Sequence, residues 1–598
     1  MSKIRKRADQ RKEDTWALED IYSTDRDWQQ DVDELERKME QFVRHQGHMS
    51  DGSERMLAVL NDYCEMNQQF GKIYVYANMR FHEDMGNSHY QKLSGQSESL
   101  RVKLGSVCSW MQPEILAMDW ETIERYLQEE KGLQLYRIFF EELFRQKAHT
   151  LSGEQEQMLA LAREMGQTPD RVYGMLQNAD MTFGMVQGRD GKQIPLTGEN
   201  FVMLEESTDR QLRRDAFEKF YTSYQKLGNT MAALFDANIR QDLFFARQRR
   251  YADTREAHLD EAPIPVQVYD QLIETVHKNL PSMYRYVALR KKLLQVEELH
   301  MYDVYVPVVL DADRKYSFEE AKKIVLEGLE PLGEEYLSIL REGFDNRWID
   351  VYENEGKRGG AYSWGDYGTH PYVLMNYQGN LNHVFTLAHE MGHSIHSYYT
   401  RKNQPYIYGQ YFTFVAEVAS TCNEVLLLQS LLEKTTDSSE RKYLLNHFLE
   451  QFKGTLFRQT MFAEFEKITH ERAEAGETLT AETLCGIYLE LNRKYFGEEM
   501  VSDPLIAWEW ARIPHFYTPF YVYQYATGLS AAVAIAKKIR NREPQAVENY
   551  KKFLSGGCSM PPLELLKLCG VDMTRPEPVQ DALDLFAKCL DDMEQEAF

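Results

Sequence analysis

The chain is organised around one stretch, Leu387-Ala388-His389-Glu390-Met391-Gly392-His393. Its two histidines stand four residues apart, so in a helix both imidazoles lie on one face and can bind the same cation. Glu390 lies about 100° further round the helix, beside the cation, where it can act on a water molecule. This spacing is typical of the zinc site of metalloproteases, although a chain of this length can also contain it by chance.

A catalytic zinc site needs a third protein ligand, and residues 414–424 offer one. They read Phe-Val-Ala-Glu-Val-Ala-Ser-Thr-Cys-Asn-Glu, a mostly apolar helical pattern that contains Glu417 and Glu424. A carboxylate is costly to bury in such a pattern unless it contacts a cation. We therefore predict that Glu417 binds zinc and that Glu424, on the same helix face, orients a ligating histidine. The alternative is that both are exposed surface acids.

Another candidate ligand lies one turn beyond the motif. A metzincin site needs Gly at 396 and His at 399, where this chain has His396 and Tyr399. In a straight helix the span from residue 389 to residue 396 is about 10 Å, which is too far for one ion. We predict that His396, like His383, is a packing neighbour of the site.

The composition bounds the class of protein. The 598 residues are 43% hydrophobic and 12% aromatic, enough for a large core, and the formal net charge is −24. Such acidity argues against nucleic acid and anionic membranes as partners. No run of about eighteen apolar residues predicts a membrane span, and no signal peptide is visible. Seven cysteines without a CxxC pair favour reduced thiols in a cytoplasm.

Helical periodicity dominates the sequence and predicts a mainly α fold. We expect a solvated tail at residues 1–15, an N-terminal helical region at 16–190 and a second region at 191–598. The boundary is placed at the hairpin signal Asp190-Gly191.

Two strands are predicted, at residues 302–309 and 372–377, and the second lies just upstream of the histidine helix. Asn380 is the expected cap of that helix. We expect an exposed edge of the second strand to hold an extended peptide, with an ordinary sheet strand as an equal alternative. The glycines of 356–360 predict a tight turn. A phosphate loop is rejected there because the Walker pattern is absent.

Four segments of the chain resemble the M3 (thimet oligopeptidase-like) family of zinc metallopeptidases, and within it oligoendopeptidase F. They are Gly356–Tyr362, Leu387–His396, Phe414–Glu424 and His515–Gly528. The resemblance implies a large helical body that encloses a deep substrate channel, with a small β-sheet near the zinc site. It implies that His389, His393 and Glu417 bind one Zn²⁺ and that Glu390 is the general base. It also implies cytoplasmic cleavage of short oligopeptides.

The last of these segments concentrates His515 and several tyrosines around Pro519. An aromatic core helix with Pro519 in its first turn is the simplest interpretation. M3 relatives use a histidine and tyrosines here to stabilise an oxyanion, which implies His515 and, first among the tyrosines, Tyr523. The loop after His515 is shorter than in thimet-type enzymes and lacks their glycines. The tyrosines left open as alternatives are therefore Tyr517, Tyr521 and Tyr525.

These observations together predict a zinc-dependent endopeptidase. A carboxypeptidase or dipeptidyl carboxypeptidase on the same scaffold is the nearest alternative. It would need Arg358, Arg401 or Arg512 to bind the C-terminal carboxylate of the substrate. A peptide-binding protein without catalysis is the second alternative, which the intact set of histidines and glutamates disfavours.

Overall fold

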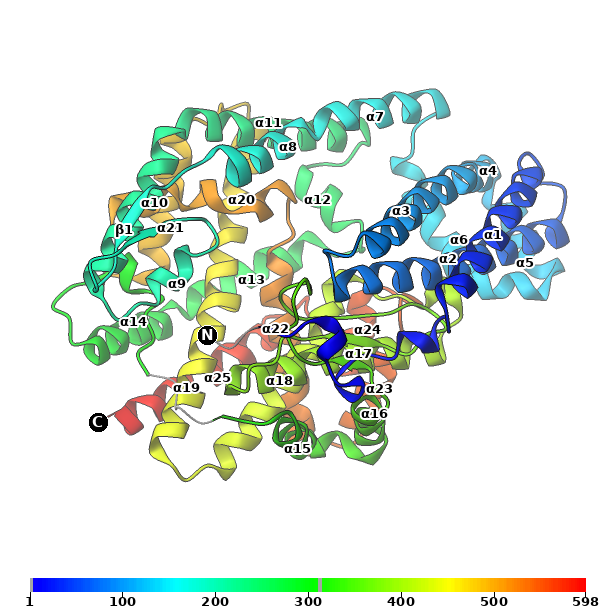
Figure 1. Cartoon of the computed structure of the whole chain (residues 1–598). Helices are drawn as coiled ribbons and strands as arrows, with labels where there is room; N and C mark the ends of the chain where they lie inside the picture. Colours follow the sequence, from blue (N-terminus) through cyan, green and yellow to red (C-terminus); the bar gives the residue numbers. More distant parts are fainter. Residues whose placement is uncertain (1–3, 310–314, 598) are drawn as a thin grey trace. The chain divides into compact units, whose positions relative to one another are not determined.

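The computed structural model describes residues 4–309 and 315–597, and the chain divides into two compact units. The first unit contains Met1–Ala148, Arg314–Ser430 and Ile535–Gly570, and the second contains His149–Asp313, Leu431–Ala534 and Val571–Phe598. Helices predominate in both units, as predicted (Figure 1). The predicted boundary near residue 190 separates two continuous stretches of sequence. Each observed unit is instead assembled from three separate segments.

The first unit begins with a helical bundle. Its helices are α1 (Asp25–Phe42), α2 (Ser53–Glu83), α3 (Ser88–Cys108), α4 (Met111–Ala117), α5 (Trp120–Glu129) and α6 (Arg137–Arg145). Apolar residues at helical spacing turn one face of α1 inward, where Trp28, Val32, Leu35 and Met39 are buried. The indole of Trp28 donates to the carbonyl of Ile73 at 2.9 Å, which joins α1 to α2.

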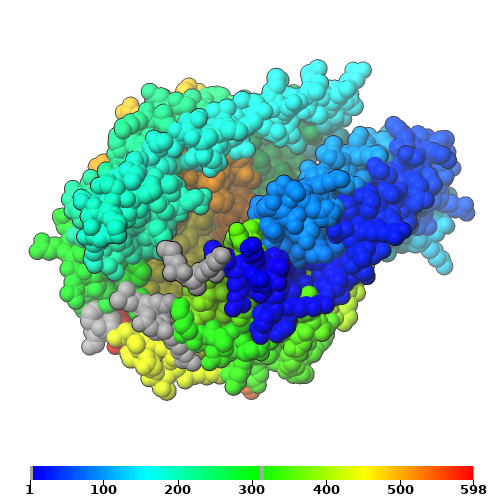
Figure 2. Space-filling model, in the orientation of Figure 1, coloured from blue at the N-terminus to red at the C-terminus, as the bar shows by residue number. Residues whose placement is uncertain are grey.

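The segment predicted to be a solvated tail makes specific contacts with this unit. Arg7 forms ion pairs with Asp350 at 2.6 Å and with Glu83 at 2.8 Å, and Asp14 is buried. For Arg7 and Asp14 the prediction of a solvated tail is wrong, because Arg7 pairs with two acids and the buried Asp14 accepts from Arg11 at 2.7 Å. Residues 1–3 of the predicted tail lie outside the described residues. Figure 2 shows the N-terminal segment in dark blue against green residues of the same unit.

The first unit contains a three-stranded sheet. Its strands are β4 (Ile349–Asp350), β5 (Tyr362–Trp364) and β6 (Tyr372–Leu374), in the order β4-β6-β5. β6 runs parallel to β4, with Ile349 opposite Val373, and antiparallel to β5, with Ser363 opposite Val373. The strand predicted at 372–377 is present over Tyr372–Leu374 only. The prediction of an exposed edge is wrong, because both edges of β6 are paired. Within residues 4–309 and 315–597, no strand pairs with the outer edge of β5.

Helices from two segments complete the first unit. They are α15 (Phe318–Gly328), α16 (Gly333–Asp345), α17 (Leu381–Asn403), α23 (Ala546–Leu554) and α24 (Pro562–Leu568), together with parts of α18 (Thr413–Lys434) and α22 (Tyr523–Arg540). α17 carries the two histidines of the central motif. Asn380 caps it as predicted, since its side chain accepts the N–H of His383 at 2.9 Å.

The second unit is almost entirely helical. Its helices are α7 (Gly153–Gly166), α8 (Thr168–Met175), α9 (Phe201–Glu205), α10 (Arg210–Lys226), α11 (Gly228–Gln248), α12 (Thr254–Leu259), α13 (Val266–Lys278), α14 (Leu280–Leu294), α19 (Ser438–Phe452), α20 (Gln459–Glu474), α21 (Ala481–Phe496) and α25 (Glu577–Ala597). The signal at Asp190-Gly191 forms the predicted hairpin between β1 (Met185–Gln187) and β2 (Gln193–Pro195).

The strand predicted at residues 302–309 is absent from this unit's sheets. β3 (Leu299–His300) pairs in parallel with β7 (Met500–Val501), and a 3-10 turn follows at Met301–Asp303. The buried carboxylate of Asp303 accepts the N–H of His300 at 3.1 Å and is paired with two arginines, so the chain turns where alternation predicted extension.

All seven cysteines are unpaired. Among the described residues, no helix has both the length and the apolarity of a membrane span.

Candidate metal centre

The predicted ligands lie where α17 crosses α18. A Cβ atom at Gly392 would stand 2.6 Å from the Cα of Ser420 and 2.8 Å from the carbonyl oxygen of Ala419. Only glycine therefore allows the two helices to approach this closely. Gly392 was not singled out from the sequence, although its place between the two motif histidines is the signal that would have indicated a close helix contact.

A buried asparagine fixes the register of the same crossing. The side-chain amide of Asn423 donates to the carbonyl oxygen of Ala388 at 3.0 Å, and its Oδ1 accepts the hydroxyl of Tyr336 at 2.8 Å. Ala388 precedes His389 in α17, and Asn423 precedes Glu424 in α18. Asn423 thus holds both helices immediately beside His389 and Glu424, two of the predicted site residues. The sequence signal for it was an asparagine within an apolar helical run.

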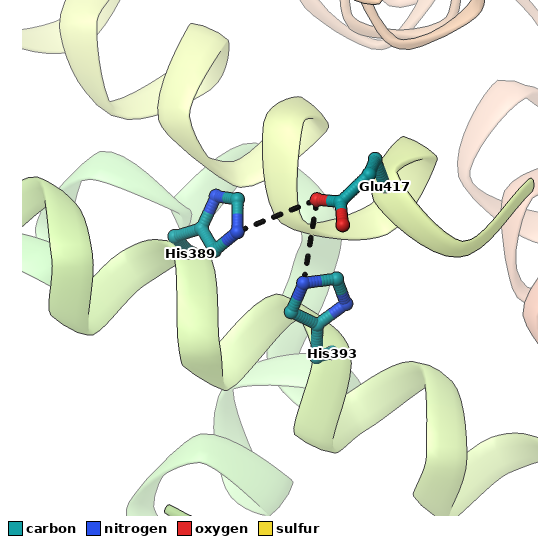
Figure 3. Close-up of side chains that lie close together, drawn as sticks. All are labelled: His389, His393 and Glu417. Atoms are coloured by element: carbon teal, nitrogen blue, oxygen red, sulfur yellow. Dashed lines mark ion pairs between the residues drawn. The ribbon is translucent and has the colours of Figure 1, made fainter. Parts of the chain in front are cut away.

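The three predicted metal ligands converge on one point (Figure 3). Oε2 of Glu417 lies 3.4 Å from Nε2 of His389 and 3.4 Å from Nε2 of His393. The three donor atoms all lie within 4.8 Å of one another, and among the described residues they form the only such group of three. Ser420 Oγ donates to the same Glu417 oxygen at 3.1 Å, which orients the carboxylate.

Glu424 contacts the opposite nitrogen of the first histidine. Its Oε1 lies 3.3 Å from Nδ1 of His389, so the Nδ1–H can donate to it and leave Nε2 directed at Glu417. Burial lowers the pKa of His389, but the carboxylates of Glu424, Glu390 and Glu417 outweigh burial and raise it to about 9. For Glu417 the effects are opposite in sign. Burial raises the pKa of its carboxyl, but the two imidazoles outweigh burial and lower the pKa to about 2.

The donor set fits a zinc ion. Two imidazoles and one carboxylate, with Glu424 bonded to the far side of a ligating ring, are the ligands of many catalytic zinc sites. Three carboxylates surround two imidazoles here, a negative balance that a divalent cation compensates.

Glu390 and His396 are buried on the same helix as the two histidines. Glu390 is 6% exposed, and burial raises the pKa of its carboxyl above the ordinary value despite the two neighbouring imidazoles. His396 is 1% exposed and stacks on Tyr411 with ring centroids 3.9 Å apart. It stands outside the group of three donors, as predicted for a packing residue.

The predicted oxyanion residues lie in the second unit. His515 belongs to a 3-10 turn, Pro514–Tyr517, and is exposed. Its Nε2 lies 3.4 Å from Oη of Tyr525, and its ring lies 6.1 Å from that of Tyr521. Partial burial and Arg458 both lower its pKa.

The four tyrosines near His515 have different surroundings. Tyr521 and Tyr525 lie beside the histidine, with their own ring centroids 5.4 Å apart. Tyr517 stacks on Tyr173 at 4.2 Å. Tyr523, the first choice from the sequence, is 3% exposed and packs against Tyr269 at 5.1 Å.

The helix of this segment starts later than predicted. α22 begins at Tyr523 and not in a turn that contains Pro519. Phe520 has φ of 55°, a left-handed conformation that a right-handed helix excludes.

The three arginines considered as carboxylate binders all have partners within their own units. Nη1 of Arg358 lies 2.8 Å from Nε2 of His82. Arg401 donates to the carbonyl of Gly365 at 3.0 Å. Nη2 of Arg512 donates to Glu509 at 2.8 Å.

Comparison with known proteins finds relatives over nearly the whole chain. A sequence model of peptidase family M3 matches residues 203–585, and one described as oligopeptidase F matches residues 114–183. Oligopeptidase PepF of Bacillus subtilis is 46% identical over 98% of this chain and 88% of its own length.

Two solved structures are similar over the same extent. Oligoendopeptidase-F from Enterococcus faecium has 39% identity and a TM-score of 0.76, covering 96% of this chain and 99% of that one. A structure from Chlamydophila abortus has 36% identity and a TM-score of 0.93, covering 99% of this chain and 100% of that one.

Proposed function

Because the chain belongs to peptidase family M3, we propose that it is a zinc endopeptidase that hydrolyses internal bonds of short peptides. The observation that carries the proposal is the convergence of His389, His393 and Glu417 on one point. Peptides are the substrates that membership of a peptidase family implies. The similar proteins that bear the names oligopeptidase PepF and oligoendopeptidase-F support internal cleavage of short chains.

The chemistry divides between the ion and the side chains. A zinc ion at this point supplies a Lewis acid for the scissile carbonyl and makes water more acidic. Glu390 takes a proton from the attacking water and returns it to the leaving amine.

We propose His515 and a neighbouring tyrosine as donors to the oxyanion of the tetrahedral intermediate. Tyr523 was the sequence-based choice. The contact between Tyr525 and His515 supports Tyr525 ahead of it, because an oxyanion donor must be accessible to the substrate and Tyr523 is 3% exposed. Of the substitutions Tyr521→Phe, Tyr523→Phe and Tyr525→Phe, we expect Tyr525→Phe to lower kcat most. A larger effect of Tyr523→Phe would restore the original assignment.

The outer edge of β5 is our proposed site for the extended peptide. Ser363 of this strand contacts Ser394 of α17 at 2.8 Å between hydroxyl oxygens, one residue after His393. Strand addition uses backbone groups of the peptide. Peptides that are N-methylated at single positions away from the scissile bond should therefore lose kcat/KM at the paired positions. An equal rate at every position would contradict pairing with β5.

The carboxypeptidase alternative is not favoured. Arg358 and Arg512 are engaged by His82 and Glu509. Arg401 donates to Gly365 through Nη2, while its Nε and Nη1 are buried and have no hydrogen-bond partner among the described residues. The case against the alternative therefore rests on the similar proteins named oligopeptidase PepF and oligoendopeptidase-F. Mass spectrometry of products from a peptide with a blocked C-terminus separates the two activities. Internal cleavage is the expected result, and loss of all cleavage on blocking would support the carboxypeptidase.

The central test combines one substitution with metal analysis. Glu390→Gln should retain one zinc ion per chain by elemental analysis and lose hydrolysis, because the variant keeps all three ligands and lacks the base. A strong chelator should abolish wild-type hydrolysis, and added Zn²⁺ should restore it. Hydrolysis by Glu390→Gln at a rate comparable to wild type would refute the assignment of the base.

Size selection and location complete the proposal. A deep channel that admits only flexible short chains is what the family resemblance implies. Cleavage rates should therefore fall steeply from short unstructured peptides to folded proteins that contain the same sequence. The seven unpaired thiols support a reducing cytoplasm as the compartment, which cell fractionation tests.

A further inference from the structure

A buried glutamate in the second unit contacts the segment that carries His515. Glu466 of α20 is 1% exposed, and its Oε1 accepts the backbone N–H of Phe520 at 3.0 Å. Its Oε2 is buried and has no hydrogen-bond partner among the described residues. The one hydrogen bond that this side chain makes therefore ends on the backbone of the segment between His515 and α22.

Phe520 needs such a contact because its backbone is strained. A phenylalanine at φ of 55° brings its Cβ close to the following carbonyl oxygen, so this conformation persists only where the surroundings enforce it. If φ returned to negative values, the peptide plane would rotate and the N–H would turn away from Glu466. The hydrogen bond thus selects the left-handed conformation.

The side chain of Phe520 is held at the same time. Its ring lies 4.6 Å from that of His470, on α20 one turn after Glu466. It also lies 5.8 Å from His258 of α12 and 5.7 Å from Tyr269 of α13. The ring of Phe520 therefore packs against side chains from three helices, α12, α13 and α20.

The direction of the chain after Phe520 decides where the tyrosines lie. The left-handed residue lies in the turn that joins the 3-10 turn of His515 to the start of α22. Tyr521 and Tyr525 then come to 6.1 and 6.0 Å from the imidazole of His515, measured between ring centroids. A change at Phe520 would move these tyrosines relative to the histidine.

We propose that Glu466 is a positioning residue that fixes Phe520 in its left-handed conformation and thereby sets the geometry of His515, Tyr521 and Tyr525. The catalytic part of this inference rests on the proposed function, in which His515 and a tyrosine donate to the oxyanion. Glu466 acts on the reaction only through this geometry. Burial raises the pKa of its carboxyl well above the ordinary value, so a neutral amide is a fair substitute.

The test compares substitutions that keep or remove the acceptor. Glu466→Gln keeps a carbonyl oxygen for the N–H of Phe520, whereas Glu466→Met has similar length and no acceptor. Glu464→Met is the matched control, because Glu464 is buried on the same helix but contacts His277 and Lys494 instead of the segment. Should Glu466→Met fail to fold, the Glu466→Asp variant takes its place in the test. Aspartate is shorter by one methylene and moves the acceptor away from the N–H of Phe520.

Two readouts are needed. NMR of labelled histidines reports on His515 without any need for activity, with its signal assigned by its loss in His515→Gln. Steady-state kinetics on a cleaved peptide give kcat and KM. For Glu466→Met we expect a shifted His515 signal, a fall in kcat of about 100-fold and little change in KM, since the misplaced groups act only in the transition state. Glu466→Gln should match wild type in both readouts.

Several outcomes would overturn the inference. An unchanged His515 signal in Glu466→Met or Glu466→Asp would do so, as would a Glu466→Gln variant as impaired as Glu466→Met. An equal loss of kcat in Glu464→Met would reduce Glu466 to a general contribution to stability. If the wild-type chain hydrolyses no peptide, the proposed function fails, and the His515 signal still decides whether Glu466 sets this geometry.

Discussion

Glu424 holds His389 through the ring nitrogen that faces away from Glu417. With a metal ion at Nε2, the 3.3 Å contact would keep the ring proton on Nδ1 and orient Nε2 toward the ion. Glu424→Gln should therefore lower zinc affinity by about 10- to 100-fold, measured by competition with a chelator of known affinity. Glu433→Gln, an exposed position on the same helix, is the control and should bind zinc as wild type does. Equal affinities for both variants would show that the contact is incidental.

The convergence of the three proposed ligands could be expected from the sequence, because helix geometry sets the spacing of the two histidines. Residues four apart in a helix lie on one face, as His389 and His393 do. Glu417 was conspicuous as a charged residue within an apolar stretch. The partner of His515 was not predictable. Tyr521, Tyr523 and Tyr525 alternate along the chain, and the left-handed residue Phe520, which no local pattern announces, decides which of them lie beside the histidine.

Glu205, a buried glutamate of the second unit, should make the free energy of unfolding depend on pH. Glu205 is 1% exposed, lines a cavity of about 60 Å³, and has an Oε1 without a hydrogen-bond partner in the described parts of the chain. Burial raises its pKa to about 9, although Arg213 and Arg512 oppose the shift. The folded chain thus holds this proton at pH values where the unfolded chain has released it. Stability should fall as pH rises from the unfolded-state pKa, near 4.5, to about 9.

The Glu205→Gln variant isolates this effect. It has no proton to lose, so its free energy of unfolding should exceed that of wild type by an amount that grows by up to about 1.4 kcal/mol per pH unit within that window. Urea unfolding at a series of pH values measures the difference. Parallel pH profiles for the two proteins would contradict the raised pKa.

The crossing of α17 and α18 depends on Gly392. A methyl group there would overlap the backbone of Ser420 and Ala419, so Gly392→Ala should destabilise the fold by about 1–3 kcal/mol. It should also weaken zinc binding, because the shift separates Glu417 from the two histidines. Thermal unfolding and zinc content measure the two effects.

Gly95 provides the matched control for this substitution. It lies within α3 of the same unit, and a Cβ there meets nothing within 4 Å. Gly95→Ala should be neutral or stabilising by up to about 1 kcal/mol, since alanine favours a helix interior over glycine. If both substitutions had the same effect on zinc content, the close crossing would have no special role.

Helices were easier to predict than strands at this level. The 3.6-residue period persists over long stretches, and the cap at Asn380 followed from its side chain. The strands of the sheet are two or three residues long, too short for an alternating pattern to identify. Their order β4-β6-β5 is a tertiary property, so the exposed edge was assigned to the wrong strand.

The assembly of each unit from three segments is the feature least accessible to sequence analysis. Periodicity reports on neighbouring residues, whereas Arg7 and Asp350 form an ion pair between two different segments of the first unit. Periodicity predicted the helical class and composition predicted a large core, because neither depends on which segments pair. Charge is a further property of the whole chain that needs no knowledge of pairing.

The net charge of −24, from 93 acidic and 69 basic residues, should favour cationic peptides. A negative field attracts lysine-rich substrates over a distance set by the Debye length, about 10 Å at 0.1 M salt. Raising the ionic strength should therefore lower kcat/KM for a lysine-containing peptide. The same peptide with norleucine in place of lysine is the control, and its kcat/KM should change little. Parallel salt profiles would show that attraction by the whole chain does not contribute, and that any preference for basic residues arises from contacts in the site.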